Sequence, residues 1–458
     1  MSGPFGASQF MYATASGFYD FEISNSLKFD NASNQNLVFT PSSAGNLRAW
    51  TLSMWVKRSN ISDQDHNIFS ANAEDNFRFM ADDTFNGSMY SAVRSAEYAN
   101  FDTSSVYRDG SAWYNIVYSW DSNNGTAANR LRVFVNGVNQ TGLSGDNSYP
   151  NQNTDSSTNL AISHAIGKQA NSTARNFDGY IAEVNFTDGT TNDASAFGEY
   201  KNDIWIPKDT SGLTFGTNGY RLQFKQTGTG QNALGVGADT SGNDNHFAAS
   251  NITASDVTIN SPTNHFAVQM STDASGSITI KEGGLQSQVT SSGNYMSAGT
   301  SIGMKGGKYY FEYRPIRGGN NSDGLPDIRL YPDGTTALSS SSDPTGSIAL
   351  SLGTKDGSDG VYMVALDLDN GKVYRGRNGS WSNSGDPTSG ATGTGAVTTL
   401  SAANLTSHLR VGVTHRYDTG TSIVTFNFGQ EGTFAGYTTA GDNADADGFG
   451  DFKYAPPS

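Results

Sequence analysis

Apolar and polar side chains alternate with a period of two through residues 49–57, AWTLSMWVK. The even-numbered positions of this segment are all apolar, whereas Thr51, Ser53 and Lys57 would point to the opposite side of an extended strand. A period of two is the pattern of a β-strand that has one face on a core and the other in solvent. The segment therefore predicts a half-buried strand.

The same pattern returns several times, and turn residues separate its copies. Residues 113–121 and 130–138 both alternate, and the step Asn136–Gly137 is expected to form a two-residue hairpin turn. Residues 178–186 would place Tyr180 and every second residue after it on one apolar face. With 53 glycines and only 16% charged residues, the composition is typical of short strands joined by tight turns. The predicted fold class is all-β.

Length and charge limit what the chain can do. Its 458 residues fit two domains, and the 11% of aromatic residues can fill two cores. The absence of cysteine excludes a disulfide framework and any thiolate site. A formal charge of −15 without a cluster of lysine and arginine argues against nucleic-acid binding. No apolar run approaches the roughly 18 residues of a membrane span, and residues 1–17 lack the pattern of a signal peptide, so we expect no membrane insertion and synthesis in a cytoplasm.

Five segments in a fixed order carry a resemblance to a known family. They lie between Leu27 and Pro207, and they read AWTLSMWVKRS, WYNIVYSWD, RLRVFVNGV, AIGKQ and FDGYIAEVNFTDG. Their order and spacing resemble the laminin-G-like, or concanavalin A-like, jelly-roll family. The resemblance implies two antiparallel sheets packed face to face, with variable loops at the rim.

The C-terminal part of the chain, residues 291–457, resembles the SPRY family of β-sandwiches. Its expected opening strand is residues 307–313, GKYYFEY, and its expected central hairpin is residues 361–374, which turn at Asn370–Gly371. Residues 422–430 would be the closing strand, and the tail ADGFGDFKYAPP is similar to the ending of the family. The resemblance implies a second antiparallel sandwich.

These segments predict four parts of the chain. Residues 1–18 are an N-terminal arm or a disordered tag, and residues 19–207 are a concanavalin A-like jelly roll. Residues 208–290 are a bridging β-rich segment, because they hold too few apolar residues in period to bury a core of their own. Residues 291–458 are a SPRY-like sandwich. The expected architecture is two tandem antiparallel β-sandwich domains.

The order of these parts, with the opening MSGPFGASQFMY, resembles tail-fibre or capsid-appendage proteins of marine bacteriophages. The resemblance implies a structural protein located in the virion, which contacts other virion proteins and attaches to a glycan or another receptor on the host surface. It also implies a homo-oligomer, with a trimer favoured. A capsid- or tail-decorating role without receptor binding is an alternative, and a glycan depolymerase is a third.

Glycan hydrolysis would need two carboxylates close together. The E-x-D-x-x-E strand found in glucanases of the concanavalin A-like fold is missing from this sequence. Glu183 and Glu312 are the glutamates inside strong strand patterns, and they fall in different predicted domains. We interpret both as residues of solvated strand faces. We predict that the protein is not an enzyme and that it uses no cofactor.

Two Asp-rich segments have the oxygen density of a calcium loop. Residues 442–451 copy the first half of such a loop, but Tyr454 stands where the closing glutamate would be. Residues 239–245 could instead be a turn whose side chains cap their own backbone. Neither segment is assigned as a metal site. The histidines are expected at the surface or in hydrogen bonds, and they are His66, His164, His246, His265, His408 and His415.

A sugar site would need an exposed aromatic ring beside loop amides. Tyr98, Tyr107, Tyr149 and Trp381 lie near turns and are candidates for the ring. Among 6 tryptophans, 21 tyrosines and 25 phenylalanines, however, most rings are expected in the cores. No ligand-binding residue is therefore assigned.

Overall fold

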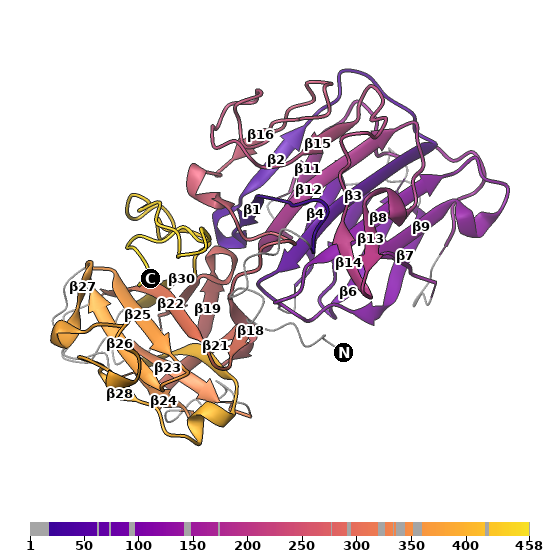
Figure 1. Ribbon diagram of the computed structural model, residues 1–458. Coiled ribbons are helices and arrows are strands. Elements are labelled where there is room, and N and C mark those ends of the chain that lie inside the picture. Colours follow the sequence, from indigo (N-terminus) through magenta and orange to yellow (C-terminus); the bar gives the residue numbers. More distant parts are fainter. Residues whose placement is uncertain are drawn as a thin grey trace. The chain divides into compact units, whose positions relative to one another are not determined.

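Antiparallel strands joined by turns and single 3-10 turns make up the protein (Figure 1). The computed structural model describes residues 18–61, 64–72, 75–90, 97–141, 148–172, 175–275, 277–290, 295–318, 326–332, 334–335, 344–350, 360–416 and 421–457. Two compact units divide the chain between Asn264 and His265. The all-β prediction is confirmed. Within the described ranges, no helix has the length and apolar character needed to cross a membrane.

The first unit is a sandwich of two sheets. Sheet 1 has the order β10-β9-β8-β3-β12-β1-β17, with β15 also beside β12, and sheet 2 has the order β16-β2-β11-β4-β5-β6-β7. The strands of sheet 1 are β1 Ser26–Phe29, β3 Ala49–Arg58, β8 Tyr114–Asp121, β9 Leu131–Val135, β10 Val138–Asn139, β12 Gly179–Asp188, β15 Tyr220–Leu222 and β17 Val257–Thr258. Those of sheet 2 are β2 Asn36–Phe39, β4 His66–Ala71, β5 Asp75–Phe79, β6 Thr84–Tyr90, β7 Glu97–Val106, β11 His164–Ile166 and β16 Ala248–Ser250.

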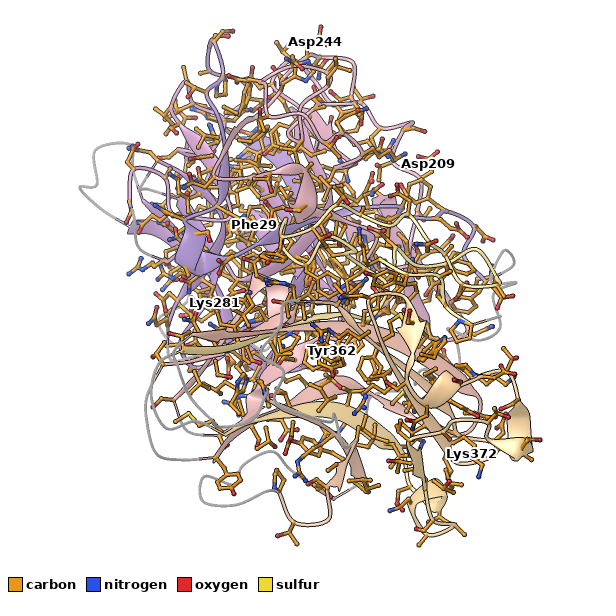
Figure 2. The ribbon with its side chains drawn as sticks, turned by 90° about the vertical axis from the view of Figure 1, so that its left-hand side faces the viewer. Phe29, Asp209, Asp244, Lys281, Tyr362 and Lys372 are labelled. Atoms are coloured by element: carbon orange, nitrogen blue, oxygen red, sulfur yellow. The ribbon has the colours of Figure 1, made fainter. Side chains whose placement is uncertain are left out.

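Stacked aromatic rings fill the space between these two sheets. Trp50 is fully buried, and its ring lies parallel to Tyr118 at 5.8 Å and to Trp120 at 6.1 Å. From sheet 2, the ring centroid of Phe77 lies 4.2 Å from the ring centroid of Tyr118. Figure 2 shows Phe29 of β1 inside the same body. Aromatic rings of this size bury enough apolar area to stabilise a sandwich without disulfides.

Strand β3 is buried on both faces, so the prediction of a half-buried strand is wrong on this point. Its apolar face lies in the core as predicted, but Lys57 on the other face is also fully buried. The chain after β12 covers the outer face of sheet 1, where Phe197 packs with Val117 and Phe134. The hairpin turn between β9 and β10 is confirmed, with φ of 48° at Asn136 and 79° at Gly137.

A β-bulge at Glu183 interrupts β12. The pairing with β3 shifts by one residue between Ala182 and Asn185, and Glu183 has a φ of 47°. The extra residue reverses the alternation, so that Ile181 and Val184 both face the core. The prediction that Tyr180 and every second residue after it share one face is therefore wrong. The bulge lies where the edge of β12 changes its partner from β1 to β15.

Glu183 forms a buried ion pair with Arg221 of β15. The Nε–Oε1 distance is 2.5 Å, and the two side chains are 4% and 7% exposed. Thr210 donates a further hydrogen bond of 3.0 Å to the same carboxylate oxygen. The interpretation of Glu183 as part of a solvated face is wrong, because the segment from Thr210 to Arg221 packs on this side of β12.

Residues 208–264, expected as the first part of a bridge, belong to the first unit. They contribute β15 and β17 to sheet 1 and β16 to sheet 2, and Tyr220, Leu222 and Phe247 lie in its core. A segment with few apolar residues need not be a linker. Residues 208–264 add strands to a core that the rest of the first unit already forms. The remainder of the expected bridge, from His265 on, supplies strands to the second unit.

The second unit is also built of two sheets. Sheet 3 has the order β18-β21-β29-β23-β24, and sheet 4 has the order β19-β20-β30-β22-β25-β26-β27, with β28 also beside β26. Sheet 3 consists of β18 Gln269–Ala274, β21 Tyr295–Met304, β23 Asp327–Pro332, β24 Ile348–Ala349 and β29 Leu409–Arg416. Sheet 4 consists of β19 Ile278–Lys281, β20 Gln286–Val289, β22 Lys308–Gly318, β25 Tyr362–Asp367, β26 Lys372–Arg377, β27 Ser380–Trp381, β28 Thr398–Thr399 and β30 Thr421–Asn427.

The predicted opening strand, central hairpin and closing strand of this unit correspond to β22, β25 with β26, and β30. Phe311 and Tyr313 of β22 lie in the core, where Tyr313 stacks on Tyr362 at 5.1 Å. In Figure 2, Tyr362 lies inside this unit and Lys372 lies toward its margin. The pattern of β22 therefore predicted its core face correctly.

Glu312, on the other face of β22, is fully buried rather than solvated. The C-terminal tail covers it, and its carboxylate accepts hydrogen bonds from the backbone N–H groups of Lys453 at 2.8 Å and Tyr454 at 2.7 Å. The hydroxyl of Tyr310 and the amide of Asn427 donate two more, at 2.9 Å and 3.2 Å. Burial raises the pKa of Glu312 above its usual value. The interpretation of a solvated face fails here because a tail more than a hundred residues away in sequence covers the strand.

The ion pair at the bulge leads to a prediction about stability. Arg221→Met would leave the carboxylate of Glu183 buried without its cation, and we expect a loss of about 3–5 kcal/mol in the free energy of unfolding, measured by urea denaturation. Adding Glu183→Gln should restore part of that loss. The control is Arg48→Met, because Arg48 pairs with Asp155 with its side chain 43% exposed, and we expect it to change stability by less than about 1 kcal/mol. Equal effects of Arg221→Met and Arg48→Met would contradict the prediction.

Candidate functional site

The outer face of sheet 2 carries a row of amide and hydroxyl side chains. In β5, Phe77 and Phe79 face the core, so Asn76, which precedes Phe77, and Arg78, which lies between the two rings, face outward. The paired strands repeat this alternation, with Phe85 of β6 and Phe101 of β7 in the core. Arg78 of β5 stands between Asn67 of β4 and Asn86 of β6. We call the outward asparagines of β4 to β7, together with Ser88 and Asp102, the amide row, and they are Asn67, Asn76, Asn86, Ser88, Asn100 and Asp102.

Hydrogen bonds between the side chains hold the amide row in place. The amide of Asn67 donates to the side chain of Asn76 at 2.8 Å. The amide of Asn86 donates to Asn100 at 3.0 Å and to Asp102 at 2.5 Å. The oxygen Oδ1 of Asn67 is buried and has no hydrogen-bond partner among the described residues. The row is therefore ordered, and most of it is buried, since Asn67, Asn76, Asn86 and Ser88 are each less than 5% exposed.

A hollow of about 640 Å³ opens on the outer face of sheet 2 beside β2 and β11. Its wall consists of Val38, Ser163, Lys168, Asn171 and Ser172. Val38 comes from β2, between the core residues at positions 37 and 39, and the other four come from the segments on either side of β11. The hollow therefore combines a hydroxyl-rich and amide-rich wall with one ammonium group and one apolar side chain.

The backbone that carries this wall is anchored to β4. Ser70 donates from its hydroxyl to the carbonyl of Lys168 at 3.0 Å and accepts from the N–H of Ala170 at 2.7 Å. The amide of Asn171 donates to the side-chain oxygen of Asn72, and the N–H of Asn72 bonds the carbonyl of Ser163 at 2.6 Å. These bonds fix the backbone and leave the ammonium of Lys168 without an ion-pair partner among the described residues.

The chemistry of the hollow suits a ligand with many hydroxyl groups. Serine hydroxyls and an asparagine amide can both donate and accept hydrogen bonds, and lysine donates three. No carboxylate lines the hollow, so its described wall lacks the acid and base pair that glycoside hydrolysis requires. In the described ranges, no group of three or more histidine, aspartate or glutamate side chains could hold a metal ion.

One carboxylate in each Asp-rich segment, Asp239 and Asp445, accepts hydrogen bonds from its own loop. Asp239 accepts hydrogen bonds from the N–H and the hydroxyl of Ser241 and from the N–H of Asn245, at 2.8–3.0 Å. This is the self-capping turn that the sequence offered as an alternative to calcium. Figure 2 shows Asp244 of the same loop at the margin of the first unit. In the second segment, Asp445 accepts two backbone N–H bonds from residues of its own loop.

None of the aromatic candidates whose side chains the structure describes lines the hollow. Tyr107 is 6% exposed and belongs to the core, Tyr149 is 43% exposed, and Trp381 is half-buried near Tyr310. The side chain of Tyr98 lies outside the described residues. The residues of the hollow carry no signal in the sequence, because four of the five lie in segments outside the strands, without a period. The amide row did carry a signal, since asparagines occupy the polar positions of consecutive strand patterns.

Three histidines are buried, and burial lowers the pKa of each ring. The pKa falls to about 4 for His66 and His164 and to about 3 for His415. His415 lies between the hydroxyls of Ser287 at 3.0 Å and Ser422 at 2.8 Å, whereas His164 accepts an N–H bond of 3.0 Å. Neither ring nitrogen of His66 has a hydrogen-bond partner in the described part of the chain. The expectation of surface or hydrogen-bonded histidines is therefore wrong for His66.

Two antiparallel sheets around one core make the first unit a β-sandwich. Residues 31–195 match the family described as the concanavalin A-like lectin/glucanases superfamily. This match confirms the predicted jelly roll. No curated protein matches the chain.

Several solved structures are similar to the chain at low identity. A candidate carbohydrate-binding protein of Bacteroides ovatus is 14% identical with a TM-score of 0.36, and the alignment covers 52% of this chain and 60% of that protein, which is less than two thirds of its length. The SPRY domain of human HERC1 is 12% identical with a TM-score of 0.25, over 34% of this chain and 96% of the domain. Domains LG4-5 of the mouse laminin alpha1 chain are 8% identical with a TM-score of 0.28, over 89% of this chain and 83% of that one.

The buried histidines predict a loss of stability in mild acid. Each ring stays neutral in the fold, whereas in the unfolded chain it takes up a proton near pH 6.5. Each ring therefore makes its full contribution to the free energy of unfolding above pH 6.5. Below that pH the contribution falls by about 1.4 kcal/mol per pH unit, until the pH reaches the pKa of the ring in the folded state. Urea unfolding at pH 5.0–6.5 should show this slope, and His66→Phe should make it shallower for the first unit. An unchanged slope in this variant would contradict the assignment of His66.

Proposed function

We propose that this protein binds glycans without catalysing a reaction, and that it serves in a bacteriophage particle as a fibre or surface appendage that attaches to the host. The glycan-binding part of the proposal rests on the polar hollow of sheet 2. The virion part rests on the order of the two sandwich domains and on the opening segment, which resemble phage appendage proteins. Other virion proteins and a glycan receptor are the partners that this role requires.

The hollow is the observation that carries the proposal. Its wall offers hydroxyl, amide and ammonium groups on a backbone that is already fixed, so little order has to be gained when a sugar binds. Val38 supplies an apolar spot against which the C–H groups of a sugar can pack. The formal charge of −15 lies elsewhere on the chain, since the described wall has a lysine and no acid.

Several copies would turn this shallow site into strong attachment. A single open hollow makes few contacts with a sugar. In an oligomer, however, binding of one hollow to a surface with repeated sugars raises the effective concentration of the other hollows near that surface. A homo-oligomer, with a trimer favoured, is therefore part of the proposal. Sedimentation or light scattering of the purified protein measures the copy number directly.

A depolymerase is the less favoured role, because the two glutamates considered for catalysis are engaged elsewhere. Glu183 is bound to Arg221 and Glu312 to the C-terminal tail, each in its own unit. A glycosidase needs a pair of carboxyl groups that faces the sugar. Release of reducing ends from a host polysaccharide would overturn the non-enzymatic proposal.

The test compares sugar binding by the wild-type protein and by variants of the hollow. We expect the wild type to bind at least one member of an array of neutral and acidic oligosaccharides. Lys168→Ala combined with Asn171→Ala should weaken that binding roughly tenfold or more, because a charged and a neutral hydrogen-bond donor are removed. The matched control is Lys225→Ala, an exposed lysine after β15 that is not part of the hollow. Equal loss in the control and the double variant would show that the hollow is not the site.

Competition with phage tests the virion role separately. Purified protein in excess should reduce adsorption of a matching phage to its host in a dose-dependent way, and the double variant should compete less well. Undisturbed adsorption, with no protein retained on the cells, would favour the decorating role without receptor binding.

A further inference from the structure

A guanidinium group is buried inside the first unit, at the end of the sandwich where β3 ends. Arg58, the last residue of β3, is fully buried. Alternation along the strand places its side chain on the same face as the core residue Val56, between the two sheets. The central carbon of the guanidinium lies over the ring of Phe79 in sheet 2, 4.7 Å from the ring centroid. The positive charge of Arg58 is therefore held in the interior of the sandwich.

The protein contacts this guanidinium through one of its nitrogens. Nη1 donates hydrogen bonds of 3.0 Å to Oδ1 of Asp83 and of 2.7 Å to the backbone carbonyl of Tyr107. Nε and Nη2 are buried and have no hydrogen-bond partner among the described residues. These two nitrogens share one edge of the group, and their N–H bonds form the fork with which arginine holds an anion. The described part of the chain supplies no acceptor to this fork.

His66 adds two more nitrogens beside the same phenylalanine ring. It is the first residue of β4, it pairs with Phe79 of β5, and it is 1% exposed. Paired residues of antiparallel strands have neighbouring side chains on one face of the sheet. Within the described ranges, neither Nδ1 nor Nε2 of His66 has a hydrogen-bond partner. Burial lowers the pKa of His66 to about 4, and the charge of Arg58 is the second cause, so the two groups interact electrostatically.

The carboxylate beside Arg58 does not compensate its charge alone. Oδ1 of Asp83 contacts Arg58, and Oδ2 accepts a hydrogen bond of 2.7 Å from Nε of Arg108. One carboxylate is therefore shared by two guanidinium groups. The side chain of Arg108 is 61% exposed and can be hydrated, whereas that of Arg58 is 0% exposed. Burial lowers the pKa of Arg58 even with Asp83 beside it, so part of the charge remains uncompensated.

We propose that Arg58 and His66 bind one small monovalent anion, of the size and charge of chloride, inside the first unit. The fork of Arg58 donates two hydrogen bonds to the anion, and an N–H of the His66 ring donates a third. The nitrogens of the site each expose less than 1 Å², so the ligand has to be small enough for the fold to enclose it. A water molecule could accept the same bonds, but it would leave the charge of Arg58 uncompensated. The anion ties the end of β3 in sheet 1 to the start of β4 in sheet 2.

The experiment measures how bromide changes the thermal midpoint of the first unit in the whole chain. Five of the six tryptophans lie in this unit, so tryptophan fluorescence mainly reports its unfolding. Sodium bromide replaces sodium methanesulfonate at constant ionic strength, because methanesulfonate is too large for an enclosed site. A ligand that binds only the folded state stabilises it, so each tenfold increase of bromide above its dissociation constant should raise the midpoint by roughly 3–5 °C. A midpoint that does not change with bromide would overturn the proposal.

Two variants assign the effect to the site. Arg58→Lys keeps the charge and loses the fork, so bromide should raise its midpoint less than half as much as that of the wild type. His66→Phe keeps an aromatic ring and loses both nitrogens, and it should weaken bromide binding roughly threefold to tenfold. It decides the matter if Arg58→Lys does not fold. The control is Arg48→Lys, in the exposed ion pair with Asp155, which should respond as the wild type does. An equal bromide response in all four proteins would overturn the site.

A crystal grown in sodium bromide locates the ion. Anomalous scattering at the bromine edge should give a peak in contact with Nε and Nη2 of Arg58 and with the ring of His66. Density at that position without an anomalous signal would be a water molecule, and the proposal would fail. Bromide found only at surface cations, such as Lys168 of the hollow, would overturn it as well. These outcomes do not bear on sugar binding, since neither Arg58 nor His66 lines the hollow.

Discussion

The buried ion pair of Glu183 and Arg221 is the contact on which the first unit depends. Strand β12 needs two partners, β1 and β15, along one edge, and an extra residue at position 183 makes the change between them possible. Neither charge could remain buried alone, because an ion without a partner in a protein interior is unfavourable by several kcal/mol. The pair therefore commits β15, and the chain that follows it, to the sandwich. The polar hollow depends on the same arrangement, since β16 pairs with β2, the strand that carries Val38.

Much of this fold was predictable, and the errors have local causes. The period of two identified β3 and β22 together with their core faces, and Asn136–Gly137 marked a true hairpin turn. The bulge was missed because positions 180, 182, 184 and 186 are all apolar, which fits a regular strand, and the reversal comes from pairing with two different strands. Lys57 and Glu312 were expected in solvent but are buried, and a tail remote in sequence covers Glu312. The hollow was missed for a related reason, since its residues come together only when the loops around β11 fold over β4.

The hollow beside β11 presents hydrogen-bonding groups and one cation on a backbone that is tied to β4. Glu183 and Glu312 are both engaged inside the fold, the first by Arg221 and the second by the C-terminal tail.

The pairing of β1 with β17 has a consequence for how the chain is made. Ser26 and Leu27 pair with Thr258 and Val257, and Ile23 exchanges hydrogen bonds with Thr263. Strand β1 can pair with β17 only after more than two hundred further residues have been synthesised. Folding that relies on contacts so distant in sequence is slow. Until then the nascent chain exposes an unpaired edge. A fragment cut at the end of the family match, at residue 195, would keep that edge open permanently, and unpaired edges of this kind promote aggregation.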